Sequence, residues 1–363
     1  METTLGLLQR DIEELRLRYP FLPAAQAPNG EGASDALLSA LEGPSVPVFD
    51  PADLALATPK TASYDDKNAN RRKQIAAQLK ARGAQRLLGA VADDALVQRL
   101  EHVKTTHPCF VAVIDDLIVE VGLARRGLGA LSGLPILLDG PPGVGKTDFC
   151  LTLADALGVP MRVLSMSAAQ AGAQIVGSDE YWANTKPGGV FEAITEGRWA
   201  NPIFVLDELD KVHGSNSGGD PVGALYQLLE RRTACCFRDL SVPWLPVDAR
   251  HVLWIATSND LSRIEGALRS RFRVFQITPP SEAEQHALLQ RLYRMELADC
   301  HAEDVLAPEL ALAHLTQLGA ASAREARIAM RRAIGWALHR KERVITLELG
   351  ASASAKPQRM GFL

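Results

Sequence analysis

The residues best suited to chemistry form a glycine-rich loop that follows an apolar segment, 135–139, and precedes a helical pattern, 147–158. The loop consists of Gly140, Pro141, Pro142, Gly143, Val144, Gly145, Lys146 and Thr147. Glycine allows backbone N–H groups to converge on a phosphate, and the start of a helix adds a favourable dipole. Lys146 can add a positive charge, and the Thr147 hydroxyl can hold Mg²⁺. The loop therefore predicts a site for the β- and γ-phosphates of a nucleotide.

A second apolar segment, 202–207, ends in two carboxylates, Asp207 and Glu208, about 60 residues after the loop. Asp207 can bind Mg²⁺ through water, and Glu208 can orient and deprotonate an attacking water. Taken alone, such a strand end could equally carry solvated acids. Its position after a phosphate loop in the same α/β pattern favours catalysis.

Three later segments supply further polar groups. Asn259 ends the apolar segment 251–258 and can hydrogen-bond the water or a phosphate oxygen without adding charge. Arg269 and Arg271 lie in an arginine-rich turn, which is either a surface turn or a source of cations for the γ-phosphate of a neighbouring subunit. Arg324 begins a later helix and either reaches back to the nucleotide or is solvated.

The elements that must position these residues alternate between strands and helices. The candidate strands are 135–139, 161–167, 202–207, 251–258 and 274–278. Such alternation predicts a parallel sheet with helices on both faces. After Pro280 only helices are expected, over 281–297, 308–318 and 322–340, and Ser281 with Glu284 fits a capping box.

The N-terminal third is different in character. Residues 4–18 have helical spacing, and 21–66 are rich in Pro, Ala, Gly and Ser and are expected to be a partly disordered linker. Residues 67–106 return to a helical pattern, with basic residues that indicate either a solvated face or a phosphate grip. The expected domains are 1–20, 21–66, 67–106, 107–280 (α/β), 281–345 (helical) and a tail, 346–363.

Composition limits the classes of function. The 363 residues are 47% hydrophobic and 23% charged, with a net charge of −4, which is ordinary for a globular protein and gives no global argument for binding nucleic acid or membranes. Five cysteines without CxxC spacing indicate a reducing compartment. No signal peptide or membrane span is apparent, so a cytoplasmic protein is expected.

The motifs GPPGVGKT, VLDE, ATSN, RSRF and SARE, in that order over residues 140–325, resemble those of AAA+ ATPases. PIFVLDELDKV, GDPVGALYQLLE and FRDLSVPWLPVDARHVLWIATSN further resemble the ATPase module of Lon proteases, over about residues 105–345. The resemblance implies a P-loop doubly wound parallel sheet of order 5-1-4-3-2, followed by a helical lid, with ATP and Mg²⁺ as cofactors.

Residue roles also follow from the resemblance. Gly140 to Thr147 would be Walker A, Asp207 and Glu208 Walker B, and Thr147 with Asp207 would hold Mg²⁺. Asn259 would be sensor 1 and Arg324 sensor 2. Arg271, or else Arg269, would be the arginine finger in a homo-oligomeric ring, usually of six subunits.

In Lon-like modules the stretch after the second strand forms a pore loop. Counting back from Pro187 and Gly188 places Trp182 at the pore aromatic, beside Tyr181. Exposed aromatics could grip an extended peptide, whereas the alternative is that both rings belong to the core. Asn184 stands where the family has glycine.

The function expected from these features is a ring ATPase that remodels, unfolds or disassembles a protein client. The sequence ends soon after the lid, so no protease domain of its own is expected. The alternative is an ATPase that acts on nucleic acid, such as a helicase or a clamp-loader-like motor, supported by the basic segment 67–86. A third possibility, a slow nucleotide-dependent switch, fits less well because the catalytic set is complete.

Overall fold

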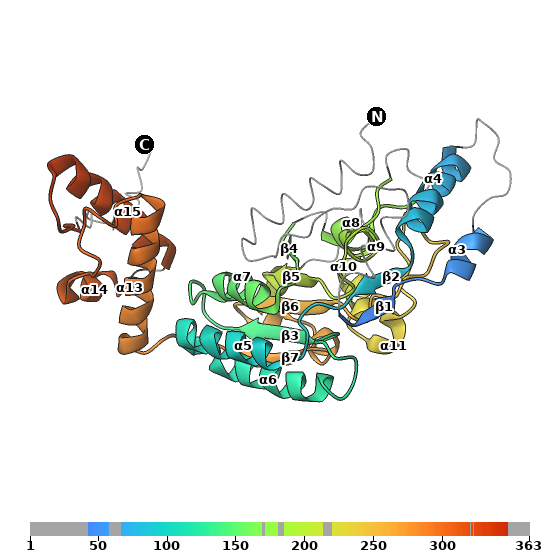
Figure 1. The fold of residues 1–363 in the computed structure, drawn as a ribbon, viewed down its shortest axis with the longest axis horizontal. Coiled ribbons are helices and arrows are strands. Elements are labelled where there is room, and N and C mark those ends of the chain that lie inside the picture. The colour runs from blue at the N-terminus through green and yellow to red at the C-terminus, as the bar shows by residue number, and fades with distance from the viewer. Residues whose placement is uncertain are drawn as a thin grey trace, which may run out of the picture.

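The computed structural model contains an α/β body and a smaller helical unit, joined by the chain segment before α13 (Figure 1). The residues that the structure describes are 43–57, 67–168, 171–180, 185–212, 220–319, 321 and 323–347. The helix expected over residues 4–18 lies outside them.

Five parallel strands form the sheet at the centre of the body, in the order β4-β5-β6-β3-β7. The strands are β3 (Pro135–Asp139), β4 (Met161–Ser165), β5 (Ile203–Asp207), β6 (Leu253–Ser258) and β7 (Arg273–Gln276). Counted along the chain, the order read from β7 is 5-1-4-3-2. The expected α/β class is confirmed. Because the strands are parallel, the residues that follow β3, β5 and β6 meet at one edge of the sheet.

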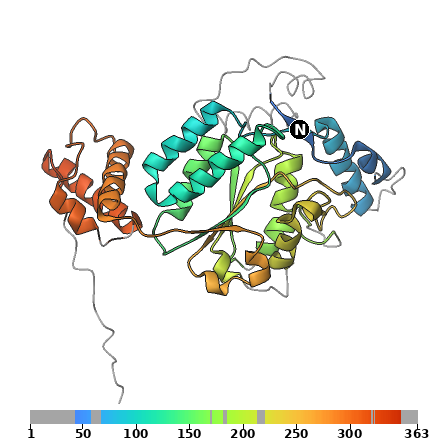
Figure 2. The same cartoon turned by 90° about the horizontal axis from the view of Figure 1, so that it is seen from below.

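Side chains of the strands alternate between two separate cores, because a sheet covered on both faces buries both sets of side chains. On β5, Ile203 and Val205 face one core, and Phe204 and Leu206 face the other. The first face is covered by α5 (Asp94–Thr106), α6 (Val111–Ala124) and α7 (Lys146–Leu157). The second is covered by α8 (Ala171–Val176), α9 (Gly189–Thr195), α10 (Pro221–Leu228) and α11 (Arg231–Ala234). Figure 2 shows the two groups on opposite sides of the sheet.

Residues 45–57 belong to the body, which corrects the linker expected over 21–66. β1 (Ser45–Pro47) pairs antiparallel with β2 (Gln85–Leu87), and α3 (Pro51–Ala57) packs on α4 (Lys67–Arg82). Val48, Phe49 and Leu54 are buried in the core that α8, α9 and α10 also enter. These few apolar residues suffice because they extend a core that the rest of the chain has already built.

The helical pattern expected over 67–106 is also interrupted. The strand β2 lies between α4 and α5, and α5 packs on α7 in the α/β body. Leu96, Leu100 and Val103 of α5 are buried in the same core as α7. The α/β body therefore begins well before residue 107, where the sequence suggested its start.

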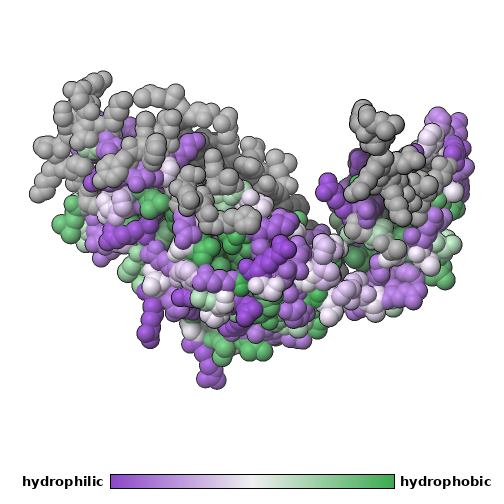
Figure 3. All heavy atoms as spheres, turned by 180° about the vertical axis from the view of Figure 1, so that it is seen from behind, coloured by the Kyte–Doolittle hydropathy of each residue, from purple (hydrophilic) through white to green (hydrophobic). Residues whose placement is uncertain are grey.

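The helical unit has a core of its own, formed by α13 (Glu282–Asp299), α14 (Leu312–Leu318) and α15 (Ala323–Arg340). The predicted capping box at Ser281 and Glu284 is present at the start of α13. Leu347, inside the expected tail, is buried in this core. In the space-filling view a notch separates the helical unit from the body (Figure 3). No helix among the described residues is long and apolar enough to cross a membrane.

Candidate active site

The loop between β3 and α7 requires glycine at three positions. Gly143 and Gly145 have φ values of 83° and 94°, a backbone conformation that residues with a Cβ rarely adopt. A Cβ at Gly140 would lie 2.4 Å from the carbonyl oxygen of Ile277. α7 begins directly afterwards, at Lys146. The loop therefore leads into a helix N-terminus, where unpaired N–H groups and the helix dipole favour a bound anion.

Lys146 joins this loop to the end of β6. Its ammonium donates to the carbonyl oxygens of Gly140 (2.6 Å) and Pro141 (3.1 Å), and to Oδ1 of Asn259 (2.9 Å). Burial lowers the pKa of Lys146, while Asp139, Asp210 and Asp207 act in the opposite direction. The structure therefore brings the predicted phosphate-binding lysine and the predicted sensor asparagine together.

Asp207 and Glu208 both contact Thr257 on the neighbouring strand. The Thr257 hydroxyl donates to Oδ1 of Asp207 (2.7 Å) and accepts from the backbone N–H of Glu208 (3.0 Å). One side chain of β6 thus holds both carboxylate residues at the end of β5, the last residue of the strand and the residue after it. Thr257 was missed as a site residue, although it lies within the ATSN stretch that drew attention to Asn259.

Glu208 has a left-handed backbone, with φ 57° and ψ 51°. This conformation costs about 1–2 kcal/mol for a residue other than glycine. It turns the chain sharply from β5 into the short 3₁₀ helix η2 (Leu209–Lys211), and the ammonium of Lys211 contacts Oε1 of Glu208. The hydrogen bond to Thr257 helps to hold the strained residue, and such strain is frequent where a side chain must be aimed.

Two further carboxylates lie around Lys146, and sequence reasoning did not select them. Asp139 and Asp210 are each only 8% exposed. Asp210 accepts from the backbone N–H of Asn259 at 3.3 Å, and Oδ1 of Asp139 has no hydrogen-bond partner among the described residues. Their positions in the sequence could have pointed to them, because Asp139 directly precedes Gly140 and Asp210 follows Glu208 by two residues.

The residues predicted to hold Mg²⁺ suit that ion. Thr147 is exposed at the start of α7, and Asp207 is partly exposed. No group of three or more His, Cys, Asp or Glu side chains that could hold a metal is found within the described ranges. Mg²⁺ commonly uses only one or two protein ligands and takes the others from water and substrate phosphates, so this sparse donor set fits.

A cleft of about 1080 Å³ lies beside the loop, between the body and the helical unit. Val144, Gly145 and Asp148 line one side, residues 105–110 line another, and Arg291 and Arg324 approach from the helical unit. This volume slightly exceeds the about 300–1,000 Å³ that small-molecule sites span, so the cleft is large enough for a small molecule. The cleft places Arg324 on the same cavity as the phosphate-binding loop.

The model of the ATPase family associated with various cellular activities (AAA) matches residues 136–280. This range contains the loop, both carboxylates, Asn259 and the arginine-rich turn. Residues 136–280 are an AAA domain.

Lon proteases are among the curated relatives that match this chain. The match is 33% identical over 165 residues to the mitochondrial Lon protease homolog of Yarrowia lipolytica, covering 46% of this chain and 14% of that protein. It is 29% identical over 204 residues to the Lon protease of Geobacter metallireducens, covering 56% and 24%. It is 34% identical over 175 residues to the Lon protease of Elusimicrobium minutum, covering 48% and 21%. The chain thus spans a quarter or less of the length of these relatives.

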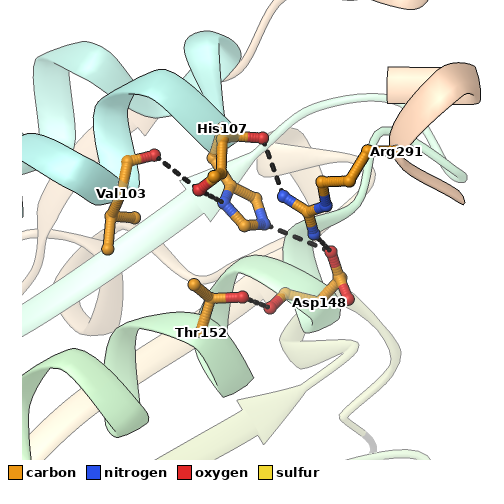
Figure 4. A network of polar contacts seen from close by, with 6 residues as sticks. Val103, His107, Asp148, Thr152 and Arg291 are labelled. Atoms are coloured by element: carbon orange, nitrogen blue, oxygen red, sulfur yellow. Dashed lines mark hydrogen bonds and ion pairs between the residues drawn. The ribbon is translucent and has the colours of Figure 1, made fainter. Parts of the chain in front are cut away.

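A polar network ties the AAA domain to α13 of the helical unit (Figure 4). Arg291 donates to Oδ2 of Asp148 (2.9 Å) and to the carbonyl oxygen of Thr106 (2.9 Å), and Nε2 of His107 lies 3.1 Å from the same Asp148 oxygen. The hydrogen bond with His107 lowers the pKa of Asp148, with Arg291 adding to the effect and burial opposing it. Asp148 is the residue after Thr147, so α13 is bonded one residue away from the phosphate loop. Sequence reasoning missed this network, because its members are far apart in the chain.

The two candidate finger arginines differ in their surroundings. Arg269 is the last residue of α12 (Gly266–Arg269), and Arg271 lies two residues further on. Arg271 donates to the carbonyl oxygen of Ala267 (2.7 Å), and its guanidinium lies 4.7 Å from the centre of the Tyr226 ring. Arg269 is exposed. Arg271 is thus packed against other residues of the same chain, whereas Arg269 is exposed to solvent.

The remaining predicted residues are placed as follows. Arg324 is exposed at the first turn of α15. Tyr181 and Trp182, expected on a pore loop, lie outside the described residues, together with Asn184.

Four arginines of the basic segment 67–86 are engaged within the chain. Arg71, Arg82 and Arg86 donate to backbone carbonyl oxygens, among them those of Ser241, Glu196 and Thr195. Arg72 pairs with Glu180. Arg86 is only 3% exposed, and burial lowers its pKa to about 10. These contacts account for much of the positive charge that suggested a phosphate-binding surface outside the AAA domain.

Proposed function

We propose that this chain is an ATPase that hydrolyses Mg-ATP to ADP and phosphate. The observation that carries the proposal is the convergence of Lys146, Asn259, Asp207 and Glu208 at one edge of the sheet, with Thr257 bonded to both carboxylate residues. The AAA match over residues 136–280 and the adjoining cleft support it.

The residues divide the reaction between them. Loop N–H groups and Lys146 hold the β- and γ-phosphates, and Asn259 orients the attacking water. Glu208 accepts a proton from that water as its oxygen bonds to the γ-phosphorus and the bond to the β-phosphate oxygen breaks. Mg²⁺ on Thr147 and Asp207 would neutralise charge that develops on the phosphate oxygens.

The arginines extend the proposal to an assembly, a homo-oligomeric ring of six subunits. Arg324 would contact the nucleotide of its own subunit from the helical unit, which then acts as the lid. Arg271 or Arg269 would reach the γ-phosphate of the neighbouring subunit. The exposure of Arg269 and the place of Arg324 on the cleft support these roles.

The proposed client is a protein, which the ring would remodel, unfold or disassemble, with Tyr181 and Trp182 gripping it. The similarity to Lon proteases supports this choice, because those relatives act on proteins. Arg71, Arg72, Arg82 and Arg86 are engaged within the chain, which weakens the support for nucleic acid. The proposed compartment is the cytoplasm.

The test is to trap the complex with Glu208→Gln in the presence of ATP and Mg²⁺. Removing the general base should slow hydrolysis by about 10²–10⁴-fold and leave ATP binding intact. Proteins that co-purify with ATP and are absent with ADP would then identify the client. Glu230→Gln, at an exposed glutamate before α11, is the matched control and should behave like the wild type.

Two outcomes would contradict the proposal. A Glu208→Gln variant that hydrolyses ATP at the wild-type rate would overturn the site. Nuclease-sensitive nucleic acid in the trapped complex, without a protein, would overturn the choice of client.

A further inference from the structure

Two short segments, residues 176–180 and 185–188, lie side by side next to α8. We call these two segments the neck. The backbone N–H of Ser178 donates to the carbonyl oxygen of Lys186 at 3.1 Å, and the Thr185 hydroxyl donates to the carbonyl oxygen of Ser178 at 2.7 Å. These hydrogen bonds therefore fix the two segments of the neck relative to each other.

A buried carboxylate, that of Asp239, is hydrogen-bonded to the backbone of the neck. Asp239 is fully buried, with Oδ2 accepting from the N–H of Gly188 (2.7 Å) and Oδ1 from the N–H of Ser241 (2.8 Å). Leu240 N–H donates to the carbonyl oxygen of Val176 at 2.8 Å. A Cβ on Gly177 would lie 2.6 Å from Oδ1 of Asp239, so this close approach requires glycine. The turn 239–241 and the neck thus form one bonded unit.

Helix α4 reaches the same unit from the N-terminal side. The Arg72 guanidinium donates to both oxygens of Glu180, at 3.0 and 3.2 Å, and Arg71 donates to the carbonyl oxygen of Ser241 at 3.1 Å. The Glu180 side chain is only 15% exposed, so its ion pair is partly shielded from water.

α4 is itself anchored on the body. Ala76 and Leu79 are buried in the core that α8, α9 and α10 enter. They lie four and seven residues after Arg72, so all three share one helix face. Because the apolar face of α4 is packed in this core, the helix holds Arg72 at a fixed position next to the neck.

We propose that Arg71 and Arg72 are positioning residues, through which α4 holds the neck in place for client binding. This inference rests on the proposed function for one step, the role of Tyr181 and Trp182 in gripping the client. The geometric part stands without it. The basic N-terminal segment then serves the loop of its own subunit and not a nucleic acid.

The geometric part is tested by hydrogen–deuterium exchange of the full chain at the amides of Gly188 and Leu240. Arg72→Glu places two negative charges together and should speed exchange there about tenfold, as local opening becomes easier. Lys80→Glu, an equal charge change at an exposed position on α4, should have no effect.

The double variant Arg72→Glu with Glu180→Arg should restore slow exchange. The milder Arg72→Gln and Arg71→Gln variants keep the test decisive if charge reversal prevents folding. Exchange at the neck equal to that of Lys80→Glu in all these variants would overturn the proposal.

The functional part uses fluorescein-labelled casein as an unfolded protein probe. Arg72→Glu should raise the casein concentration for half-maximal stimulation of ATP hydrolysis about tenfold, as expected for the loss of a positioned contact of about 1.4 kcal/mol. Basal kcat and the KM for ATP should stay unchanged, and the charge-swapped double variant should recover the response. A changed KM for ATP with an unchanged casein response would overturn positioning. A wild-type protein that casein neither binds nor stimulates would instead contradict the proposed client class, while the exchange result would still decide the geometry.

Discussion

The ammonium of Lys146 lies 2.9 Å from Oδ1 of Asn259, although 113 residues separate the two in the chain. β3 and β6 are neighbours in the sheet, paired from Pro135 with Trp254 to Asp139 with Ser258, and this register brings their following residues together. The cation proposed to hold the phosphates and the amide proposed to orient water thus lie within hydrogen-bond distance of each other.

Replacing Asn259 by alanine should impair chemistry more than binding. Asn259→Ala should lower kcat by about 10²-fold, because a positioned polar group acts mainly on the transition state. Its affinity for ATP should change by less than about threefold. Steady-state kinetics and nucleotide titration measure both quantities. Ser262→Ala, at an exposed hydroxyl bonded to Asp260, is the control. An equal loss of affinity and kcat would show that Asn259 only supports Lys146.

The hydroxyl of Thr257 should matter for stability as well as activity. Thr257→Val keeps the shape but leaves the Glu208 N–H and Asp207 without their partner, which should cost about 1–3 kcal/mol of unfolding free energy. The kcat should fall as well, since Glu208 loses its support in the left-handed conformation. Thr257→Ser retains the hydroxyl and should keep most of both. Denaturant unfolding with parallel ATPase assays checks this, and equal behaviour of Val and Ser variants would contradict it.

Arg291 should couple the position of the helical unit to nucleotide binding. Arg291→Ala removes the bonds to Asp148 and Thr106, and should weaken ATP binding about tenfold, because closure of the cleft then has less support. Arg332→Ala, at an exposed arginine of the same unit, should bind ATP normally. Isothermal titration calorimetry provides the comparison. Equal affinities for the two variants would show that the network is only structural.

An arginine that acts across a subunit interface should be recognisable when two inactive variants are mixed. Arg271→Ala alone should lose activity, by up to about 10³-fold if it is the finger. Mixing it with Lys146→Ala subunits should restore part of the activity, because some interfaces then combine an intact loop with an intact finger. Arg269→Ala is the matched comparison. Recovery with Arg269→Ala alone would assign the finger to Arg269, which would fit the packing of Arg271 on Tyr226.

Asp239 should give stability a defined pH dependence. Burial raises the pKa of Asp239 to about 6. Hydrogen bonds from Gly188 and Ser241 and the positive charge of Arg71 lower this pKa, but their combined effect is smaller than that of burial. The pKa of an unfolded aspartate is about 3.9, so the folded state binds this proton more tightly. The stabilisation is full below about pH 4 and is lost as pH rises through about 6, an effect of about 2–3 kcal/mol.

The comparison variant is Asp239→Asn, whose side chain does not titrate. Urea unfolding of the wild type and of this variant from pH 4 to pH 7 measures the difference. The wild type should lose stability relative to the variant as the pH rises. A difference that is constant over this range would show that the carboxyl does not titrate there.

Local motifs predicted the α/β fold, and the residues that they single out for the site remain predictions. The β3–loop–α7 unit and the strand ending in Asp207 are contiguous in the sequence, so their geometry follows from glycine content, helix start and apolar run length. The ordered segment 45–57 and the strand β2 were not predicted, because their apolar residues are few and gain stability only from a core built elsewhere.

The sequence by itself determined that this protein has a glycine-rich loop leading into a helix, a strand followed by acidic residues and a parallel α/β sheet, because each depends on neighbouring residues. Only the tertiary structure decided that Thr257 supports Asp207 and Glu208, that Arg291 reaches Asp148, and that α4 holds the neck. Those contacts join residues from 49 to 143 positions apart. Their partners are set by strand order and helix packing, which no local pattern encodes.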